Sequence, residues 1–301
     1  MAEQAVGFIG LGRMGGGMAR NLLSTGQPVK AFDMSAEMLG AVVTAGATAA
    51  ASPAETAADC DVIFLCLPSA AEVREVLFEG EGNLASSGRT LTVIDTSTMD
   101  RSEAIAFTQQ AAAAGITYCD CPVSGMPFRA EAGTLTVMFG GPAEVFGQVH
   151  PLLDTFGETI VHCGPVGSGQ AMKAINNILY NVHIAALAEV LPLTVAAGLE
   201  TSAVAQVVTT ASARSFASDY FVPRMLQGRF DTDFTMKAAY KDITNVQAMA
   251  KETSAQLPVV QAMIQSYDAA IAAGFGDEPK SSMLKVYEQA LGVEFRDRPD
   301  D

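Results

Sequence analysis

The stretch GFIGLGRMGGGMARNL, residues Gly7–Leu22, decides the fold predicted for this chain. Gly10, Gly12 and Gly15 form the pattern G-x-G-x-x-G, which follows an apolar run and opens a stretch of helical character. In that context the first glycine permits a tight turn and the second lets the backbone approach a pyrophosphate. The third lets the helix pack closely on the strand. Ordinary glycine-rich turns can contain the same pattern, so the prediction depends on the apolar run before it and the helical stretch after it.

An acidic residue follows where a dinucleotide-binding fold needs one. Asp33 ends the next apolar run, about 20 residues beyond the glycines, and would accept hydrogen bonds from the adenosine ribose. Its carboxylate would repel the 2′-phosphate of NADP, and no arginine follows in AFDMSAEM. We therefore expect NAD as the cofactor. The residues expected to bind it here are Gly10, Leu11, Gly12, Arg13, Met14, Gly15 and Asp33.

The bulk composition excludes several classes of protein. The chain has 301 residues, 49% of them hydrophobic, with a net charge of −15 and a pI of about 4.5. Such an acidic chain repels nucleic acid and anionic membranes, which predicts a soluble, cytoplasmic protein that acts on a small molecule. Five cysteines without metal-ligand spacing predict reduced, packed thiols and no metal site. The N-terminal residues show no signal peptide.

Two domains are expected. Up to about residue 165, short apolar runs alternate with helical stretches, which predicts crossover units on a largely parallel sheet. After Gly164–Gly169 no further strand is predicted, and a long helix begins near Gln170. The fold class is therefore an α/β N-terminal Rossmann dinucleotide-binding domain (1–165) followed by an all-α C-terminal domain for substrate and oligomerisation (166–301). The predicted strands are Ala5–Ile9, Val29–Phe32, Val62–Leu67, Leu91–Asp95, Thr117–Pro122, Thr134–Phe139 and Thr159–Cys163.

The long helix raises the question of a membrane span. The apolar stretch Ile178–Gly198 is interrupted, which favours a buried helix of a soluble protein. The interrupting residues are Asn181, His183, Glu189 and Pro192. Its apolar residues nevertheless cover more faces than one domain can bury. We therefore expect this helix to contribute to a homo-oligomer, either a homodimer or a homotetramer.

Three further motifs carry a family resemblance. They are CDCPVSGMPFRAEAGTL (Cys119–Leu135), GSGQAMKAINN (Gly167–Asn177) and AYKDI (Ala239–Ile243). Together with the glycine loop, in this order over essentially the whole chain, they resemble the β-hydroxyacid dehydrogenase family. That family includes 3-hydroxyisobutyrate dehydrogenase and tartronate semialdehyde reductase, and 6-phosphogluconate dehydrogenase is a more distant relative.

The resemblance implies roles for matching positions. Lys173 falls on the catalytic lysine, and Ser124 and Gly125 fall on the turn that holds the substrate carboxylate. The other implied contacts are Asn177 with the substrate, Thr96 near the nicotinamide, Leu67 and Pro68 beside the cofactor's ribose and diphosphate, and Lys241 closing over the cofactor.

The chain departs from the family after the Ser-Gly turn. Most members continue with another glycine, whereas here Met126-Pro127-Phe128-Arg129 follows. Arg129 could pair with the far end of a substrate, and an ordinary surface arginine is an equal alternative.

The same residues support this chemistry physically. Lys173 and Asn177 are four apart on a predicted helix and so project from one face. A lysine can accept the hydroxyl proton of an alcohol if burial or a second cation such as Lys241 lowers its pKa. Without the family motifs, a solvated helix-surface lysine would be the default interpretation.

The predicted function is hydride transfer between a small, 3-hydroxyisobutyrate-like β-hydroxy acid and NAD, giving a semialdehyde or keto acid. A tartronate semialdehyde, succinic semialdehyde or glyoxylate reductase of the same family is an alternative. A non-catalytic dinucleotide-binding scaffold is an alternative of another class, and the presence of Lys173 argues against it and against imine reduction.

Overall fold

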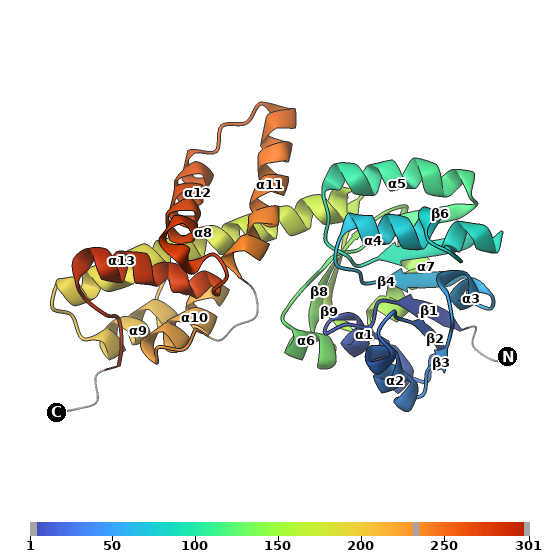
Figure 1. Ribbon diagram of the computed structural model, residues 1–301, viewed down its shortest axis with the longest axis horizontal. Coiled ribbons are helices and arrows are strands. Elements are labelled where there is room, and N and C mark those ends of the chain that lie inside the picture. Colours follow the sequence, from blue (N-terminus) through green and yellow to red (C-terminus); the bar gives the residue numbers. More distant parts are fainter. Residues whose placement is uncertain (1–4, 231–234, 298–301) are drawn as a thin grey trace. The chain divides into compact units, whose positions relative to one another are not determined.

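The computed structural model describes residues 5–230 and 235–297. The chain forms two compact units, Met1–Lys173 and Ala174–Asp301, and the division falls inside one long helix. The first unit holds a sheet with helices around it, and the second is built from helices (Figure 1).

The first unit is built on a mostly parallel sheet. Its order is β3-β2-β1-β4-β5-β6-β8-β7, with β9 paired to β8. Every neighbouring pair from β3 to β6 is parallel, β8 runs antiparallel to β6 and β7, and β9 runs parallel to β8. The strands are β1 (Val6–Ile9), β2 (Val29–Phe32), β3 (Thr48–Ala49), β4 (Val62–Leu65), β5 (Leu91–Asp95), β6 (Ile116–Asp120), β7 (Val123–Ser124), β8 (Leu135–Gly140) and β9 (Gly157–Gly164).

The strand order reverses at β1. This strand lies between β2 and β4, so the chain leaves it toward one side of the sheet and later crosses to the other. Open α/β sheets bind ligands in the crevice outside the carboxyl ends of the strands at such a reversal. The topology therefore puts the glycine loop that follows β1 at the expected binding position.

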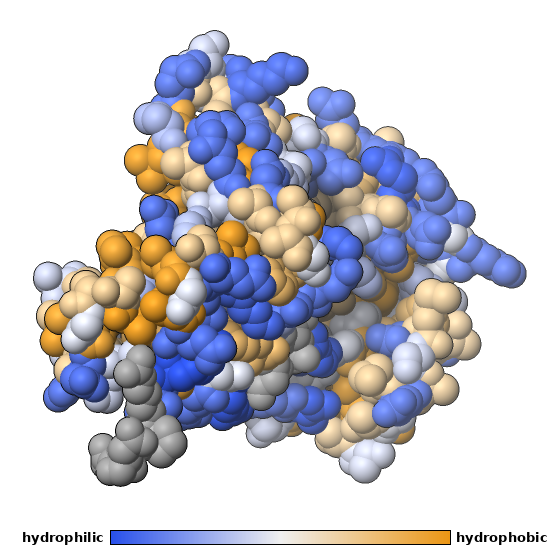
Figure 2. Space-filling model, turned by 60° about the vertical axis from the view of Figure 1, so that its left-hand side comes forward, coloured by the Kyte–Doolittle hydropathy of each residue, from blue (hydrophilic) through white to orange (hydrophobic). Residues whose placement is uncertain are grey.

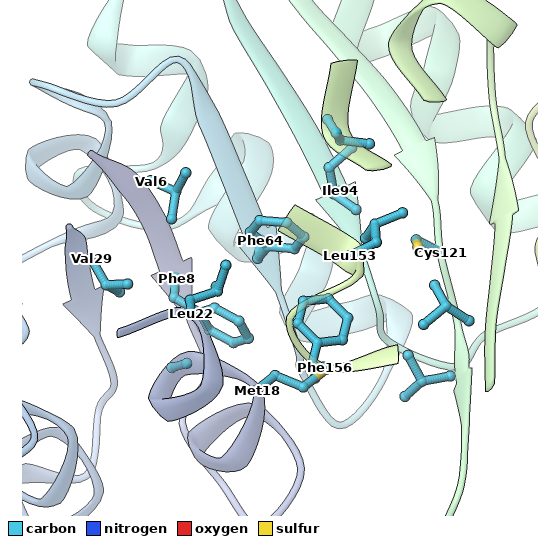
Figure 3. Packing of buried hydrophobic residues seen from close by; sticks show 14 of the residues in the cluster. Val6, Phe8, Met18, Leu22, Val29, Phe64, Ile94, Cys121, Leu153 and Phe156 are labelled. Carbon is cyan, nitrogen blue, oxygen red and sulfur yellow. The ribbon is translucent and has the colours of Figure 1, made fainter. Parts of the chain in front are cut away.

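Helices cover the sheet and close its core. Phe64 on β4 stacks on Phe8 of β1 and meets Phe156 edge-on, with 5.8 Å between ring centroids in both pairs (Figure 3). All three side chains are fully buried, and Met18 and Leu22 of α1 join the same cluster. The helices are α1 (Gly15–Ser24), α2 (Ala36–Thr44), α3 (Pro53–Ala57), α4 (Ala70–Arg74, continued by a π-helical turn, Glu75–Glu79), α5 (Arg101–Ala113), α6 (Pro127–Glu131) and α7 (Ala143–Leu153).

The predicted Rossmann-type unit and the predicted helical region are confirmed, whereas the shortest elements were not foreseen. These are β3, β7, α3 and α6, and none exceeds five residues. Such elements are too short to show a period of their own. In the described part of the chain, no strand follows β9 except an isolated bridge between Thr235 and Pro279.

The second unit packs its helices around α8. Ile178, Ile184 and Leu191 on one face of α8 are buried with Phe221 and Tyr267. Gly198 and Gly228 follow α8 and α10, and both glycines have positive φ. The helices are α8 (Ser168–Ala196), α9 (Thr201–Thr210), α10 (Phe216–Leu226), α11 (Met236–Thr253), α12 (Pro258–Ala270) and α13 (Leu284–Leu291), with 3₁₀ turn Lys280–Met283 before α13.

Within residues 5–230 and 235–297, α8 is the one helix long and apolar enough to cross a membrane. Its contacts are those of a core helix: Asn181 is fully buried and its Oδ1 accepts a 2.8 Å hydrogen bond from Nζ of buried Lys280. One face of the helix is therefore fixed by protein packing, as the polar residues in the stretch predicted.

One further glycine in the opening stretch, Gly17, has a packing role that the sequence did not reveal. A Cβ on Gly17 would lie 3.0 Å from backbone atoms of Ala130 and Glu131, so α1 approaches α6 backbone to backbone. Asn21, one turn later, donates a 2.7 Å hydrogen bond to the Ala130 carbonyl. Gly40 in α2 has nothing within 4 Å of the same position.

We expect opposite effects from the same substitution at two helical glycines. Gly40→Ala should stabilise the protein by about 0.5–1 kcal/mol because alanine loses less backbone entropy in a helix. Gly17→Ala should destabilise it by about 1–3 kcal/mol because the methyl group would push α1 from α6. Urea unfolding of both variants measures the difference, and equal shifts would show that the α1–α6 contact is not tight.

Candidate active site

The glycine loop is held in place by sterics at both of its ends. Gly10 has φ of +91°, and a Cβ there would overlap the Cys66 carbonyl oxygen at the end of β4. A Cβ on Gly15 would overlap the Gly10 carbonyl oxygen, so α1 begins in direct contact with the turn. Gly12, in contrast, is exposed and faces open space. The first and third glycines therefore serve close packing, and the middle one faces open space.

The loop presents the start of a helix to that space. Met14 is the residue before α1, and no side chain caps the helix there. Leu11 is buried, whereas the Arg13 side chain is exposed. Backbone amides and the helix dipole at such a terminus favour phosphate groups.

Asp33 is fixed beside the glycine loop. Its Oδ2 accepts a 2.6 Å hydrogen bond from the Leu11 amide, and its Oδ1 accepts one of 2.7 Å from the Ser35 amide. An ionised carboxylate has about four lone-pair sites, so both oxygens can still accept ribose hydroxyls. The open position at Gly12, the helix terminus and this carboxylate together fit an NAD molecule.

The loops after β4 and β5 lie at the same edge of the sheet. The Cys66 amide donates to the Ile9 carbonyl at 2.9 Å, which joins the loop before Leu67 and Pro68 to the end of β1. The Leu67 amide donates to Ser97 Oγ at 2.8 Å. Thr96 is 3% exposed, and its hydroxyl donates to the Leu65 carbonyl at 2.6 Å. The residues predicted to flank the cofactor are thus next to one another.

The structure also brings Lys173 to the predicted carboxylate-binding turn. Lys173 Nζ, on the second turn of α8, donates a 2.8 Å hydrogen bond to the Val123 carbonyl of β7. Ser124 and Gly125 follow directly, and Gly125 has φ of +150° with Leu135 only 2.6 Å from its Cβ position. The lysine and the Ser-Gly turn, which are far apart in the sequence, therefore adjoin.

Three other predicted residues have different surroundings. Asn177 lies one turn after Lys173 on α8, half-buried, and its Oδ1 accepts a 3.2 Å hydrogen bond from Asn176. Lys241 lies on α11, and its side chain is outside the described part of the chain. The Arg129 guanidinium donates to the Thr134 carbonyl and pairs with Glu158 at 3.2 Å, which favours the interpretation of Arg129 as a structural residue.

Sequence reasoning missed a buried carboxylate beside this turn. Asp120, at the end of β6, accepts hydrogen bonds of 2.6 Å from the Gly167 amide and 2.7 Å from the Gln170 amide, at the start of α8. Burial raises the pKa of its carboxyl to about 6, and the two amides partly oppose that shift. The sequence did contain a feature that could have identified Asp120. It lies between two cysteines in an apolar, strand-like run, and a charged group that is buried there needs hydrogen-bond partners.

The thiols take no part in the site that the structure describes. The five cysteines are free, and burial raises the pKa values of Cys66 and Cys119 to about 11 and about 12. Such groups stay protonated and unreactive at neutral pH. Among the described residues, no group of three or more His, Cys, Asp or Glu side chains could hold a metal ion.

Comparison with known proteins identifies the family. Residues 5–164 match the model for the NAD-binding domain of 6-phosphogluconate dehydrogenase. Residues 167–287 match the model described as NAD-binding of NADP-dependent 3-hydroxyisobutyrate dehydrogenase. The chain belongs to the β-hydroxyacid dehydrogenase family.

Relatives of this β-hydroxyacid dehydrogenase differ in their named substrates. It is 39% identical to 2-(hydroxymethyl)glutarate dehydrogenase of Eubacterium barkeri over 96% of each chain. L-threonate dehydrogenase of Cupriavidus necator is 33% identical over 94% of this chain and 95% of its own. The crystal structure of 3-hydroxyisobutyrate dehydrogenase from Salmonella typhimurium matches with a TM-score of 0.84 and 30% identity, over 94% of this chain and all of the other.

The family and the site together establish the reaction class. The protein is an oxidoreductase that transfers a hydride between a small β-hydroxy acid and NAD. The reduced partner is an alcohol, and the oxidised partner is the corresponding semialdehyde or keto acid.

Asp33 sets the cofactor preference that we predict. NAD should support kcat/KM at least about tenfold above NADP, because about 1.4 kcal/mol of repulsion of the 2′-phosphate gives that ratio. Asp33→Asn removes the charge and should narrow the ratio, whereas Asp59→Asn, at an exposed carboxylate, should not change it. Steady-state kinetics with both cofactors measure the ratio, and equal use of NADP by the unaltered enzyme would contradict the prediction.

Proposed function

We propose that this β-hydroxyacid dehydrogenase oxidises a 3-hydroxyisobutyrate-like acid, and that Lys173 exchanges the proton of the substrate hydroxyl. The observation that carries the proposal is the 2.8 Å contact between Lys173 Nζ and the Val123 carbonyl, directly before the Ser-Gly turn. It joins a proton-exchanging group to an anion-binding turn in the unit that also holds the glycine loop and Asp33.

The Val123 carbonyl suits a lysine that changes its protonation state. A neutral amine still has two N–H groups, so one can donate to this carbonyl while the lone pair faces the substrate hydroxyl. Proton transfer then needs no movement of the side chain, and the pKa of the lysine must fall toward the working pH for it to act as a base. The sequence offers Lys241 as a second cation that would lower that pKa if it approached Lys173.

The remaining groups bind and orient the substrate. The Ser124 hydroxyl and the Gly125 amide would hold the carboxylate, and the Asn177 amide would hold the hydroxyl that Lys173 deprotonates. NAD, when bound by the glycine loop, Asp33, Leu67, Pro68 and Thr96, supplies the acceptor for the hydride. In the reverse reaction the Lys173 ammonium polarises the carbonyl and returns the proton.

A panel of acids tests this function. We expect turnover with NAD for one or more of 3-hydroxyisobutyrate, 2-(hydroxymethyl)glutarate, L-threonate, L-serine and glycerate, monitored by NADH absorbance. Lys173→Ala should lower kcat by about 10²–10⁴-fold, the range for general acid–base catalysis, with NAD affinity unchanged. Lys285→Ala, at a lysine paired with Glu278, is the matched control.

Two results would contradict the proposal in different ways. Near-normal turnover by folded Lys173→Ala would remove the lysine from the mechanism but leave the reaction class intact. NAD binding without turnover of any acid in the panel, in either direction, would favour the non-catalytic scaffold.

We further propose that residues 1–165 bind NAD, that residues 166–301 serve substrate binding and oligomerisation, and that the enzyme is cytoplasmic. The strong acidity and the five free, reduced thiols support a cytoplasmic location. An apolar face of α8 supports a homo-oligomer. Ile175, Leu179, Val190 and Leu193, spaced by whole turns, are 44–55% exposed. Figure 2 shows apolar residues gathered on the surface of the helical unit.

The proposed role of the exposed apolar face of α8 can be tested by changing two of its residues. The double substitution Leu179→Glu and Leu193→Glu should shift a dimer or tetramer toward monomer, because it places two charges on the apolar face through which the subunits would associate. Contiguous apolar surface on a soluble protein often marks such an interface. Sedimentation equilibrium measures the mass. Met34→Glu, at a residue that is 93% exposed on the first unit, should leave it unchanged. A monomeric unaltered protein would refute the proposal.

A further inference from the structure

A continuous chain of buried hydrogen bonds joins the cofactor-side loops to the helix of Lys173. Gln170 lies one turn before Lys173 on α8 and is 2% exposed. Its Nε2 donates to the Ser97 carbonyl at 2.7 Å, and its Oε1 accepts from the Met99 amide at 3.2 Å. The amide side chain thus uses its donor and its acceptor on one loop, Ser97–Met99.

That loop is itself tied to the cofactor side of the site. Ser97 Oγ accepts the 2.8 Å hydrogen bond from the Leu67 amide, and the Ser97 amide donates to buried Asp95 at 2.9 Å. Thr96, expected beside the nicotinamide, lies between these anchored residues. A displacement of Gln170 would therefore change the spacing between Lys173 and the loops that flank the cofactor.

Asp120 fixes the same helix from the other side. Its two oxygens accept the Gly167 and Gln170 amides, so the first turn of α8 is fixed to the end of β6. A Cβ on Gly169 would overlap the Met138 carbonyl and lie 2.8 Å from Asp120. The helix therefore starts with its backbone in contact with the sheet, which leaves the helix start little freedom to shift.

We propose that Gln170 and Asp120 are positioning residues that set the place of Lys173 relative to the cofactor. Neither needs to contact substrate. The inference rests on the proposed role of Lys173, because a positioning residue acts only through the group that it places. A misplacement of about 1 Å can cost about 10²-fold in rate, so the effect should appear in kcat.

A double-mutant cycle tests the inference. Gln170→Met keeps the side-chain length and removes both hydrogen bonds. With the best acid of the panel we expect kcat to fall about 10–100-fold and the Kd for NAD to change less than about twofold. In a Lys173→Ala background the same substitution should lower kcat less than about twofold, because residues that act as a unit are not additive. Gln148→Ala, at an exposed glutamine on α7, is the control.

A measurement that does not depend on turnover complements the double-mutant cycle. Hydrogen exchange of the backbone amides in 167–173 should speed up in Gln170→Met, with the amides of the glycine loop unchanged. Asp120→Asn removes one of the two amide contacts and should give the same non-additive loss of kcat, so the inference stays testable if Gln170→Met fails to fold.

The outcomes separate the inference from the proposed function. A folded Gln170→Met with normal kcat, or one whose loss is equally large without Lys173, would overturn the positioning role and leave the role of Lys173 standing. Normal turnover by Lys173→Ala would overturn both.

Discussion

The site depends on how closely the backbone of α1 approaches the end of β1. A side chain at Gly10 or Gly15 would overlap a carbonyl oxygen, so only glycine permits this approach. The close contact brings the start of the helix to the point where the strand order reverses, which is where open α/β sheets bind ligands. Without it, the amides of the helix start would lie farther from the end of β1.

The same physical solution occurs a second time at α8. Gly140 and Gly169 leave room for Asp120 between helix and sheet, and the carboxylate accepts two amides of the helix start. At the first site, Asp33 likewise accepts the Leu11 amide of the glycine loop. In both places an acidic side chain at a strand end fixes a backbone segment whose own hydrogen bonds are incomplete. Asp33 thereby fixes the glycine loop, and Asp120 fixes the start of the helix that carries Lys173.

Different parts of the long helix α8 have three different surroundings. Its first turns carry buried Gln170 and the hydrogen-bonded Lys173, its middle buries Ile178 and Ile184 in the helical core, and a third face leaves Leu179 exposed. Mean hydropathy does not distinguish these faces, which explains why the helix resembles a membrane span by length and composition. Burial of Asn181 against Lys280 is the feature that distinguishes it, since such a pair gains from protein contacts and would be costly in lipid.

Local pattern was enough for the overall fold, and it also predicted a dinucleotide loop. Alternating apolar runs predicted the parallel sheet, and the spacing of Gly10, Gly12, Gly15 and Asp33 predicted the dinucleotide loop, because these features depend on neighbours along the chain. The resemblance placed Lys173 and Ser124 in one site, but the sequence could not give the Val123 carbonyl as the lysine's partner.

Arg129 shows most clearly what the sequence leaves open. Its position in the sequence was compatible with a substrate-binding residue or with an ordinary surface arginine, and its contacts with Thr134 and Glu158 arise only in the folded chain. Asp120 and Gln170 were invisible for the same reason, since their partners lie on segments distant in sequence. Sequence alone determined which backbone conformations are possible, and tertiary structure decided which buried polar groups meet, because each such group must find its partner wherever the chain folds back.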